Sequence, residues 1–310
     1  MLIDPLGRFV ISSLGWIDKG SLWILDTSNN EVKTQQLSKA NYLTLHAGTG
    51  ASFAVQHHFD DGNTQITVHT FDNPANILAS CKFNLECCEV YGDCANWSNV
   101  PKHYVANIKE SENTDFVLLS IQENGKATAN RFDWFDDTYD KMYQGIIGVT
   151  AIPESDQILV SVQRSSKVVI CNLNGKKNGE FELAKSYGNP RLQFRKTGSE
   201  LWADDYDKLL VLETGTWRIL LSRRLQDAAK DTAQFIGEYC FTTDGNYCCV
   251  SRPFSGDVLI LDPVTLKTRY QARLGSQPLE AVMMSDRRVF ARDWQSGALL
   301  HGKASRVWFA

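Results

Sequence analysis

The sequence predicts an all-β chain in which one antiparallel unit is repeated, and three observations support this. The stretch Tyr247 to Gly275 contains three short strand-like runs separated by turn residues at Pro253, Gly256 and Asp262-Pro263, the pattern of an antiparallel meander. Similar units recur at intervals of roughly 40 to 50 residues. Helical composition is confined to residues 225–231. Seven units fill the 310 residues, so we expect a seven-bladed β-propeller of four-stranded antiparallel blades.

The repeat is clearest where one strand of each unit ends in a polar residue. An apolar run precedes this residue, and a second apolar run follows after a short polar turn. The seven closing residues are Ser12, Gln56, Asn107, Gln163, Asp204, Arg252 and Arg292. Because they occupy the same place in each unit, we expect them to lie on one face of the fold, at the start of the connecting loops.

We expect the units to form a single domain, residues 1–310. The blades are expected at about residues 2–37, 42–83, 85–133, 145–183, 191–225, 235–274 and 279–309. Blade three is the least regular, because residues 96–101 interrupt it. With these boundaries the chain begins on an inner strand and ends on an outer strand, so the first and last blades would close the ring by side-chain packing. The alternative is a terminal strand that crosses from one of these blades to the other.

One segment brings out a likeness to a known repeat. Residues 255–275, SGDVLILDPVTLKTRYQARLG, resemble the YVTN-type β-propeller repeat, and residues 20–37 and 166–183 are looser copies. The Gly-His and Trp-Asp dipeptides of WD40 repeats are missing at blade-defining positions, so the chain is WD40-like in architecture only. The resemblance implies a propeller. Families of this kind serve mostly as binding platforms, with some enzymes among them, and fold alone does not choose between these roles.

Charge and hydropathy narrow the choice of partners. The net charge is -4 and the densest basic site is the pair Arg223-Arg224, so there is no basic field for nucleic acid. No apolar segment approaches the length of about 20 residues that crosses a bilayer. The first residues show no leader pattern, and we therefore expect a cytoplasmic protein.

The eight cysteines do not predict a metal site. Cys171, Cys240 and the adjacent pair Cys248-Cys249 fall in predicted strands, where a thiol behaves as a small apolar group. The cluster Cys81, Cys87, Cys88 and Cys94, with His103 nearby, lacks the paired CxxC spacing of a zinc site. We expect reduced thiols and no cofactor.

Candidate binding residues gather at and beside the closing positions. Arginines donate two hydrogen bonds to a carboxylate or phosphate, and aromatic residues at a rim suit protein or sugar partners. A polar residue at a strand end is equally ordinary turn chemistry, and an arginine beside an aspartate is equally a structural ion pair. The candidate set is Gln56, His57, His58, Asn107, Trp134, Gln163, Asp204, Tyr206, Arg252, Arg292, Asp293 and Trp294, with Phe254 as a further rim aromatic.

Residues 132–144, FDWFDDTYDKMYQ, alternate carboxylates with aromatic residues. Clustered carboxylates suit calcium, but the spacing does not match an EF-hand loop and there is no glycine at the bend. We expect a packed lid or a partner-binding edge that contains Trp134.

No catalytic motif is present: the chain has no GxSxG, HExxH or P-loop pattern. We therefore expect a non-enzymatic platform that binds a protein or glycan partner through the loop face. The alternative is a channel-mouth hydrolase or lyase acting on an anionic small molecule. In that case Arg252 and Arg292 would anchor the substrate, and His57 or His58, with Asp204, would act in acid-base catalysis.

Overall fold

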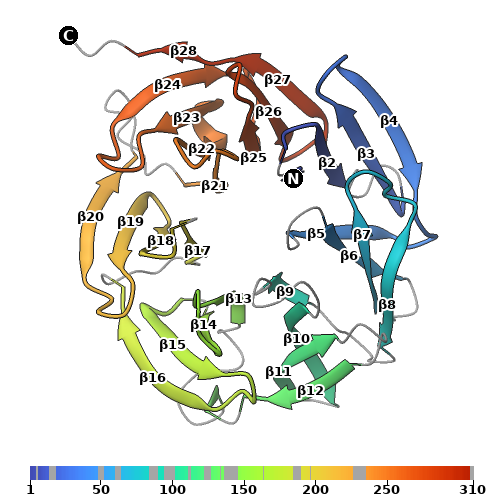
Figure 1. The fold of residues 1–310 in the computed structure, drawn as a ribbon, viewed down its shortest axis with the longest axis vertical. Coiled ribbons are helices and arrows are strands. Elements are labelled where there is room, and N and C mark those ends of the chain that lie inside the picture. The colour runs from blue at the N-terminus through green and yellow to red at the C-terminus, as the bar shows by residue number, and fades with distance from the viewer. Residues whose placement is uncertain are drawn as a thin grey trace. The chain divides into compact units, whose positions relative to one another are not determined.

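The computed structural model describes residues 1–307 except residue 5 and the segments 14–18, 48–51, 60–63, 84–89, 94–101, 111–112, 122–126, 133, 136–145, 163, 184–189, 196 and 226–234. The described strands are antiparallel and form a β-propeller architecture, which confirms the predicted fold class (Figure 1). The chain divides into two compact units. One comprises Met1–Ile17, Leu22–Thr34 and Arg195–Ala310, and the other comprises Asp18–Ser21 and Gln35–Phe194.

Three four-stranded sheets lie within residues 35–194, each with its strands in chain order. The first contains β5 (Tyr42–Ala47), β6 (Ser52–His58), β7 (Thr64–Thr70) and β8 (Ile77–Phe83). The second contains β9 (Val90–Asp93), β10 (Lys102–Glu110), β11 (Asn113–Ile121) and β12 (Ala127–Arg131). The third contains β13 (Ile146–Ala151), β14 (Gln157–Val162), β15 (Lys167–Asn172) and β16 (Lys177–Glu182).

The other sheets come from the two ends of the chain. The N-terminal sheet contains β1 (Leu2–Ile3), β2 (Phe9–Ser13), β3 (Ser21–Asp26) and β4 (Glu31–Gln36). The next contains β17 (Leu192–Phe194), β18 (Glu200–Asp205), β19 (Lys208–Glu213) and β20 (Ile219–Arg224). A five-stranded sheet contains β21 (Tyr239–Phe241), β22 (Cys248–Arg252), β23 (Asp257–Leu261), β24 (Thr268–Arg273) and β28 (Ser305–Arg306). The last contains β25 (Pro278–Met283), β26 (Arg288–Asp293) and β27 (Leu299–Lys303).

The prediction of seven four-stranded blades is wrong, because the described part of the structure shows six blades and its sheets contain three to five strands. Among the described residues, six sheets contain four strands or more, and the sheet β25–β27 contains three. The cause is the path of the chain after β27. Ala304 is buried, and β28 then pairs with the outer strand of the preceding sheet, with Tyr270 opposite Arg306 and Gln271 opposite Ser305. The last residues therefore extend that sheet to five strands and leave their own sheet without a fourth.

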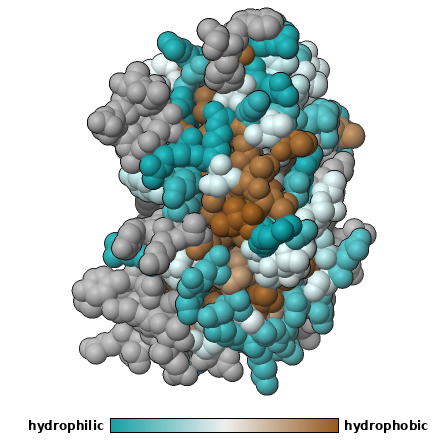
Figure 2. All heavy atoms as spheres, turned by 90° about the vertical axis from the view of Figure 1, so that its left-hand side faces the viewer, coloured by the Kyte–Doolittle hydropathy of each residue, from teal (hydrophilic) through white to brown (hydrophobic). Residues whose placement is uncertain are grey.

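Strand burial follows position within each sheet. The third strands β3, β19 and β23 are mostly buried because neighbouring side chains cover both faces, whereas β27, the third strand of the last sheet, has no buried residue. Fourth strands are mostly exposed. In the fourth strand β20, Ile219 and Leu220 are exposed by 39% and 41%. Figure 2 views the side on which β20 lies in Figure 1 and shows hydrophobic side chains gathered there.

Side chains join the N-terminal sheet to the last sheet. Val10, Trp23 and Leu25 pack with Val282 and Phe290 in one buried cluster. The N-terminal ammonium also pairs with Glu280. Strand β1 pairs with β2, within its own sheet. Packing of this kind is what the predicted blade boundaries imply.

Arg288 makes the polar part of the same junction. Its guanidinium donates to the carbonyl oxygen of Thr27 at 2.9 Å and to the side-chain oxygen of Asn30, and it pairs with Asp286 at 2.6 Å. Removing this side chain leaves the Thr27 carbonyl oxygen without this donor.

We expect Arg288→Ala to lower the free energy of unfolding by about 1.5–3 kcal/mol, because hydrogen bonds to charged groups contribute that much. Urea unfolding followed by circular dichroism measures the change. Arg218→Ala is the matched control, since this arginine is 73% exposed and pairs only at 3.6 Å with Glu213. Equal unfolding midpoints for the two variants would contradict a role of Arg288 in joining the sheets.

Candidate functional site

The candidate site lies on the loops at one end of three neighbouring sheets in the unit containing Arg195–Ala310. Tyr206 lies in the turn between β18 and β19, and Phe235 lies in the connection from β20 to β21. Phe254 is in the 3₁₀ turn η1 (Pro253–Ser255) between β22 and β23, and Trp294 follows β26. Four aromatic residues from four separate loops therefore face the same region.

These residues form an exposed aromatic cluster. The ring centroid of Phe235 lies 5.6 Å from that of Trp294, 5.9 Å from that of Phe254 and 6.3 Å from that of Tyr206. Phe254 and Trp294 are 6.0 Å apart and edge to face. Despite these contacts, Tyr206 and Phe254 are each 52% exposed and Trp294 is 46% exposed. We call Tyr206, Phe235, Phe254 and Trp294 the aromatic surface.

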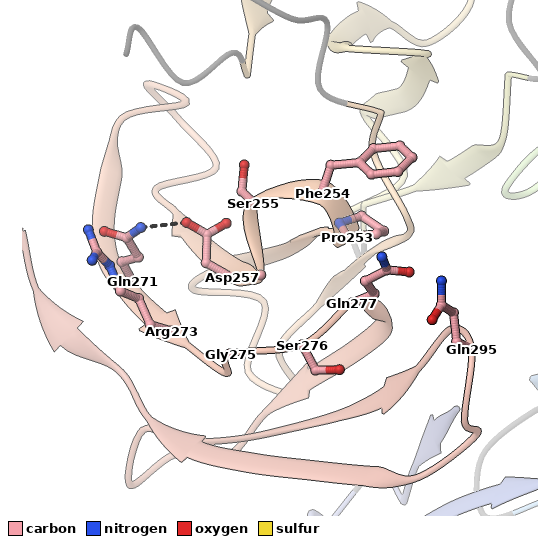
Figure 3. Close-up of a pocket in the computed structure, with 11 residues that line it drawn as sticks. Pro253, Phe254, Ser255, Asp257, Gln271, Arg273, Gly275, Ser276, Gln277 and Gln295 are labelled. Carbon is pink, nitrogen blue, oxygen red and sulfur yellow. Dashed lines mark hydrogen bonds between the residues drawn. The ribbon is translucent and has the colours of Figure 1, made fainter. Parts of the chain in front are cut away.

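A polar groove of about 710 Å³ adjoins the aromatic surface at Phe254. Its lining comprises residues 253–257, Gln271, Arg273, residues 275–277 and Gln295. Figure 3 shows Gln271 and Arg273 projecting from β24 on one side, with Phe254, Gln277 and Gln295 on the other. The groove thus lies between η1 and the connection from β24 to β25.

Backbone contacts fix the two walls of the groove. Leu274 donates its N–H to the carbonyl oxygen of Gly256 at 2.9 Å. Gly256 has a φ of +68°, and a Cβ there would lie 3.0 Å from the carbonyl oxygen of Ser276. A side chain at this position would be strained and would push the walls apart.

Arg252 and Asp257 form a buried ion pair beneath η1. Nε of Arg252 donates to Oδ1 of Asp257 at 2.8 Å, and Nη2 donates to Oδ2 at 2.6 Å. Both residues are directly opposite each other on β22 and β23 and are 6% and 3% exposed. Arg252 also donates to the carbonyl oxygen of Leu225 at 3.2 Å. The arginine thus holds the η1 hairpin rather than presenting itself to a ligand.

Arg292 is also engaged. It pairs with Glu280, which lies opposite it on β25 and also contacts the N-terminal ammonium. Burial alone would raise the pKa of the Glu280 carboxyl, but the two cations lower it to about 2. The surroundings of Arg252 and Arg292 therefore do not support the expectation that they anchor an anionic substrate. They match the alternative interpretation of the sequence, in which each arginine forms a structural ion pair.

Asp293 holds the loop that presents Trp294. Its carboxylate accepts hydrogen bonds from the hydroxyls of Ser276 and Ser296 and from the backbone N–H of Gln277 at 3.0 Å and of Gln295 at 3.1 Å. Burial alone would raise the pKa of this carboxyl, but these donors hold it well below its usual range. The carboxylate ties the turn after β26 to the connection before β25.

His57 belongs to a buried hydrogen-bonded chain in the other unit. Its Nδ1 lies 2.8 Å from Oγ of Ser38 and its Nε2 lies 2.7 Å from Oγ1 of Thr67. Thr67 in turn contacts Nε2 of His69 at 2.6 Å, and Nδ1 of His69 lies 2.7 Å from the carbonyl oxygen of Pro74. Burial, with the neighbouring histidines, lowers the pKa of His57 to about 4. Both ring nitrogens are occupied, so His57 has no free position for a substrate proton.

The remaining predicted residues fall in varied places. Gln56 and Asp204 are buried within their strands, and burial lowers the pKa of His58 to about 4. Trp134 is 8% exposed, packs edge to face on Phe135, and donates its indole N–H to the carbonyl oxygen of Gly175 at 3.1 Å. A partner could not reach this indole without unpacking the cluster. Gln163 and the side chain of Asn107 lie outside the described residues.

No metal-binding cluster of His, Cys, Asp or Glu occurs in the described part of the chain. Of the cysteine group whose spacing argues against a zinc site, Cys87, Cys88 and Cys94 lie outside the described residues, as does most of the acidic segment 132–144. Within the described ranges no helix is long and apolar enough to cross a membrane.

Sequence reasoning missed Phe235, Arg273 and Gln277. Phe235 follows a segment without strand periodicity, so nothing placed it near the rim. Arg273 could have been found, since the meander puts it opposite Asp257 once the turn at Asp262-Pro263 sets the register.

No protein-family model matches the chain, and no curated protein is similar to it in sequence. Solved structures are similar in fold. The β-propeller domain of Cps50 (Swd1) from Myceliophteria thermophila matches with a TM-score of 0.70 and 12% identity, covering 98% of this chain and 95% of that one. The periplasmic gluconolactonase PpgL of Pseudomonas aeruginosa matches with a TM-score of 0.66 and 15% identity, covering 96% of each chain. At such identities the similarity shows the fold alone.

We expect Arg252→Ala to lower the free energy of unfolding by about 3–5 kcal/mol, because it leaves the Asp257 carboxylate buried without its counter-ion. Arg269→Ala is the control: its pair with Asp262 is on the surface, and we expect a loss below about 1 kcal/mol. Chemical unfolding of both variants measures the difference. Similar losses of unfolding free energy in the two variants would contradict a structural role for Arg252 and would support a role in ligand binding.

A second prediction concerns pH. The pKa of His57 falls from 6.5 to about 4 on folding. Between these pH values the imidazole is therefore protonated in the unfolded chain and neutral in the folded chain. The resulting stability is present above pH 6.5 and is lost as the pH falls to 4, by up to about 3 kcal/mol. Urea unfolding between pH 7 and pH 4 should show a weaker pH dependence in His57→Gln than in the wild type. The exposed His301, changed to Gln, should leave the dependence unchanged, and a His57 variant that also does so would contradict this assignment.

Proposed function

We propose that the chain is a single propeller domain that binds a protein partner through the aromatic surface. The observation that carries this proposal is the exposure of Tyr206, Phe254 and Trp294 although they gather around Phe235. Exposed apolar clusters rimmed by polar groups mark interaction sites, and aromatic residues dominate the binding energy of such sites.

Two loops of the aromatic surface are held by an ion pair and by hydrogen bonds, which favours a binding site over an incidental exposed hydrophobic patch. The ion pair of Arg252 with Asp257 and the hydrogen bonds to Asp293 hold the loops that present Phe254 and Trp294. A surface that is already ordered loses less conformational entropy when a partner binds.

The channel-mouth enzyme is less well supported. Arg252 and Arg292 pair with carboxylates, and both nitrogens of His57 are hydrogen-bonded. The residues proposed for substrate anchoring and for the base therefore serve local structure. We further propose that binding takes place in the cytoplasm, because Cys240 and Cys249 lie directly opposite each other as free thiols, as in a reducing compartment.

Site-specific photo-crosslinking tests the proposal. A benzoylphenylalanine residue replaces Phe254 or Trp294 in cells that express the chain, and the crosslinked proteins are identified by mass spectrometry. We expect one macromolecular partner at both positions. Excess wild-type chain should compete with the crosslink, and the double variant Phe254→Ala/Trp294→Ala should compete at least tenfold less well, since hot-spot aromatics each contribute about 2 kcal/mol or more.

Val264 provides the control position. It is 65% exposed and lies in the turn between β23 and β24, at the opposite end of the same sheet from η1. Equal crosslinking at 264, or no crosslink at 254 and 294, would overturn the proposal. Circular dichroism of the double variant should match the wild type, because both side chains are about half exposed.

A further inference from the structure

The polar groove beside the aromatic surface is lined by two charged residues of opposite sign, Asp257 and Arg273. Arg252, Asp257 and Arg273 lie directly opposite one another on the adjacent strands β22, β23 and β24, so two guanidinium groups share one cross-strand row with one carboxylate. Arg252 occupies both oxygens of Asp257, and Gln271 donates a further hydrogen bond to Oδ2. Both oxygens of the Asp257 carboxylate therefore already accept hydrogen bonds from residues other than Arg273.

Arg273 remains without a counter-ion. It is exposed at the groove, and no hydrogen bond or ion pair to it occurs among the described residues. The contrast with the same strand is clear, because Arg269 pairs with Asp262 at 2.6 Å. Of the charged side chains that line the groove, Asp257 and Arg273, only Arg273 is uncompensated.

Gln277 provides a second unfilled position. Its backbone is fixed on both sides: its N–H donates to Asp293 at 3.0 Å, and its carbonyl oxygen accepts from the N–H of Trp294 at 2.8 Å. Its side-chain Oε1 is buried but has no hydrogen-bond donor among the described residues. A buried acceptor without a donor is costly. The Gln277 side chain lines the groove, so rotation of its amide toward the groove would let a ligand N–H satisfy the oxygen.

We propose that the groove binds an extended acidic segment of the protein partner. A side-chain carboxylate of the segment pairs with Arg273, a backbone N–H donates to Oε1 of Gln277, and a neighbouring apolar side chain packs on Phe254 and Trp294. Figure 3 places Arg273 on one side of the groove and Phe254, Gln277 and Gln295 on the other, so a ligand that meets both ends must span it. The inference rests on the proposed function and names the chemistry of the partner.

A peptide fits this set better than a free anion. An inorganic anion would use Arg273 but has no N–H for Gln277 and no apolar group for the aromatic surface. A volume of about 710 Å³ holds several residues' worth of side-chain and backbone atoms. The pairing with Arg273 is at an exposed site, so the affinity should fall as salt is added.

Fluorescence anisotropy with labelled peptide pools tests the inference. In one pool an Asp or Glu is fixed next to a Leu or Phe, with all other positions random; in the matched pool the acid is replaced by Asn or Gln. The ends are acetylated and amidated, so that no terminal carboxylate contributes. We expect the wild-type chain to bind the acidic pool at least tenfold more tightly than the amide pool.

Three variants locate the site. Arg273→Gln should abolish the preference for the acidic pool, whereas Arg269→Gln, on the same strand but paired with Asp262, should keep it. Gln277→Leu, which removes the amide oxygen at nearly constant volume, should weaken binding of both pools several-fold. Equal binding of both pools by the wild type, or an unchanged preference in Arg273→Gln, would overturn the proposal.

Competition distinguishes the other ligand classes. Inorganic phosphate or free glutamate that displaces the acidic pool at micromolar concentration would identify a small-anion site instead. Binding of neutral oligosaccharides that depends on Trp294 would identify a glycan site. A protein crosslink at 254 and 294 without any acidic preference would leave the proposed function standing and remove only this inference, whereas failure of both experiments would remove both.

Discussion

The candidate site depends on buried carboxylates that tie the loops of one sheet to the next strand or loop. Asp257 holds Arg252 across the η1 hairpin, and Asp293 joins the turn at Trp294 to the connection at Ser276 and Gln277. A buried carboxylate is stable only when its hydrogen-bonding capacity is filled, so each of these groups enforces one loop conformation. The loops that carry the exposed Phe254 and Trp294 are thereby fixed.

The same construction explains why charged residues near the site differ in role. Arg252 lies opposite Asp257 in the strand register, and Arg292 lies opposite Glu280. Each arginine forms an ion pair with the carboxylate opposite it. Arg273 also lies opposite Asp257, but the carboxylate is already occupied. One carboxylate between two arginines therefore produces both a structural pair and an unpaired cation, and only the second is available to a ligand.

Much of the fold could be predicted from the sequence because strands leave a strong local signal. The run Val258–Leu261 lies within β23, and of the predicted closing residues Arg252 ends β22 and Arg292 lies one residue before the end of β26. The three-stranded last sheet could not be foreseen, because residues 305–306 read as an outer strand of their own sheet, whereas in the structure they follow the buried Ala304 and pair with β24. The strand pattern says nothing of which sheet edge a terminal segment joins.

The candidate site was predicted only in part, because contacts between distant segments also decide which side chains are exposed. The aromatic residues Tyr206, Phe254 and Trp294 were found because they follow strand ends, whereas Trp134 has the same composition signal and is buried. Exposure is decided by packing between segments far apart in sequence. The arginines were misjudged because their partners lie across a hairpin.

Hydrogen exchange of the chain, alone and in complex with its isolated partner, tests the central claim most directly. We expect slower exchange on binding in residues 253–257, 275–277 and 294–297, the loops that carry Phe254 and Trp294 and line the groove. Protection confined to the outer strand β20, or to the turn around Val264, with these loops unchanged, would contradict the claim.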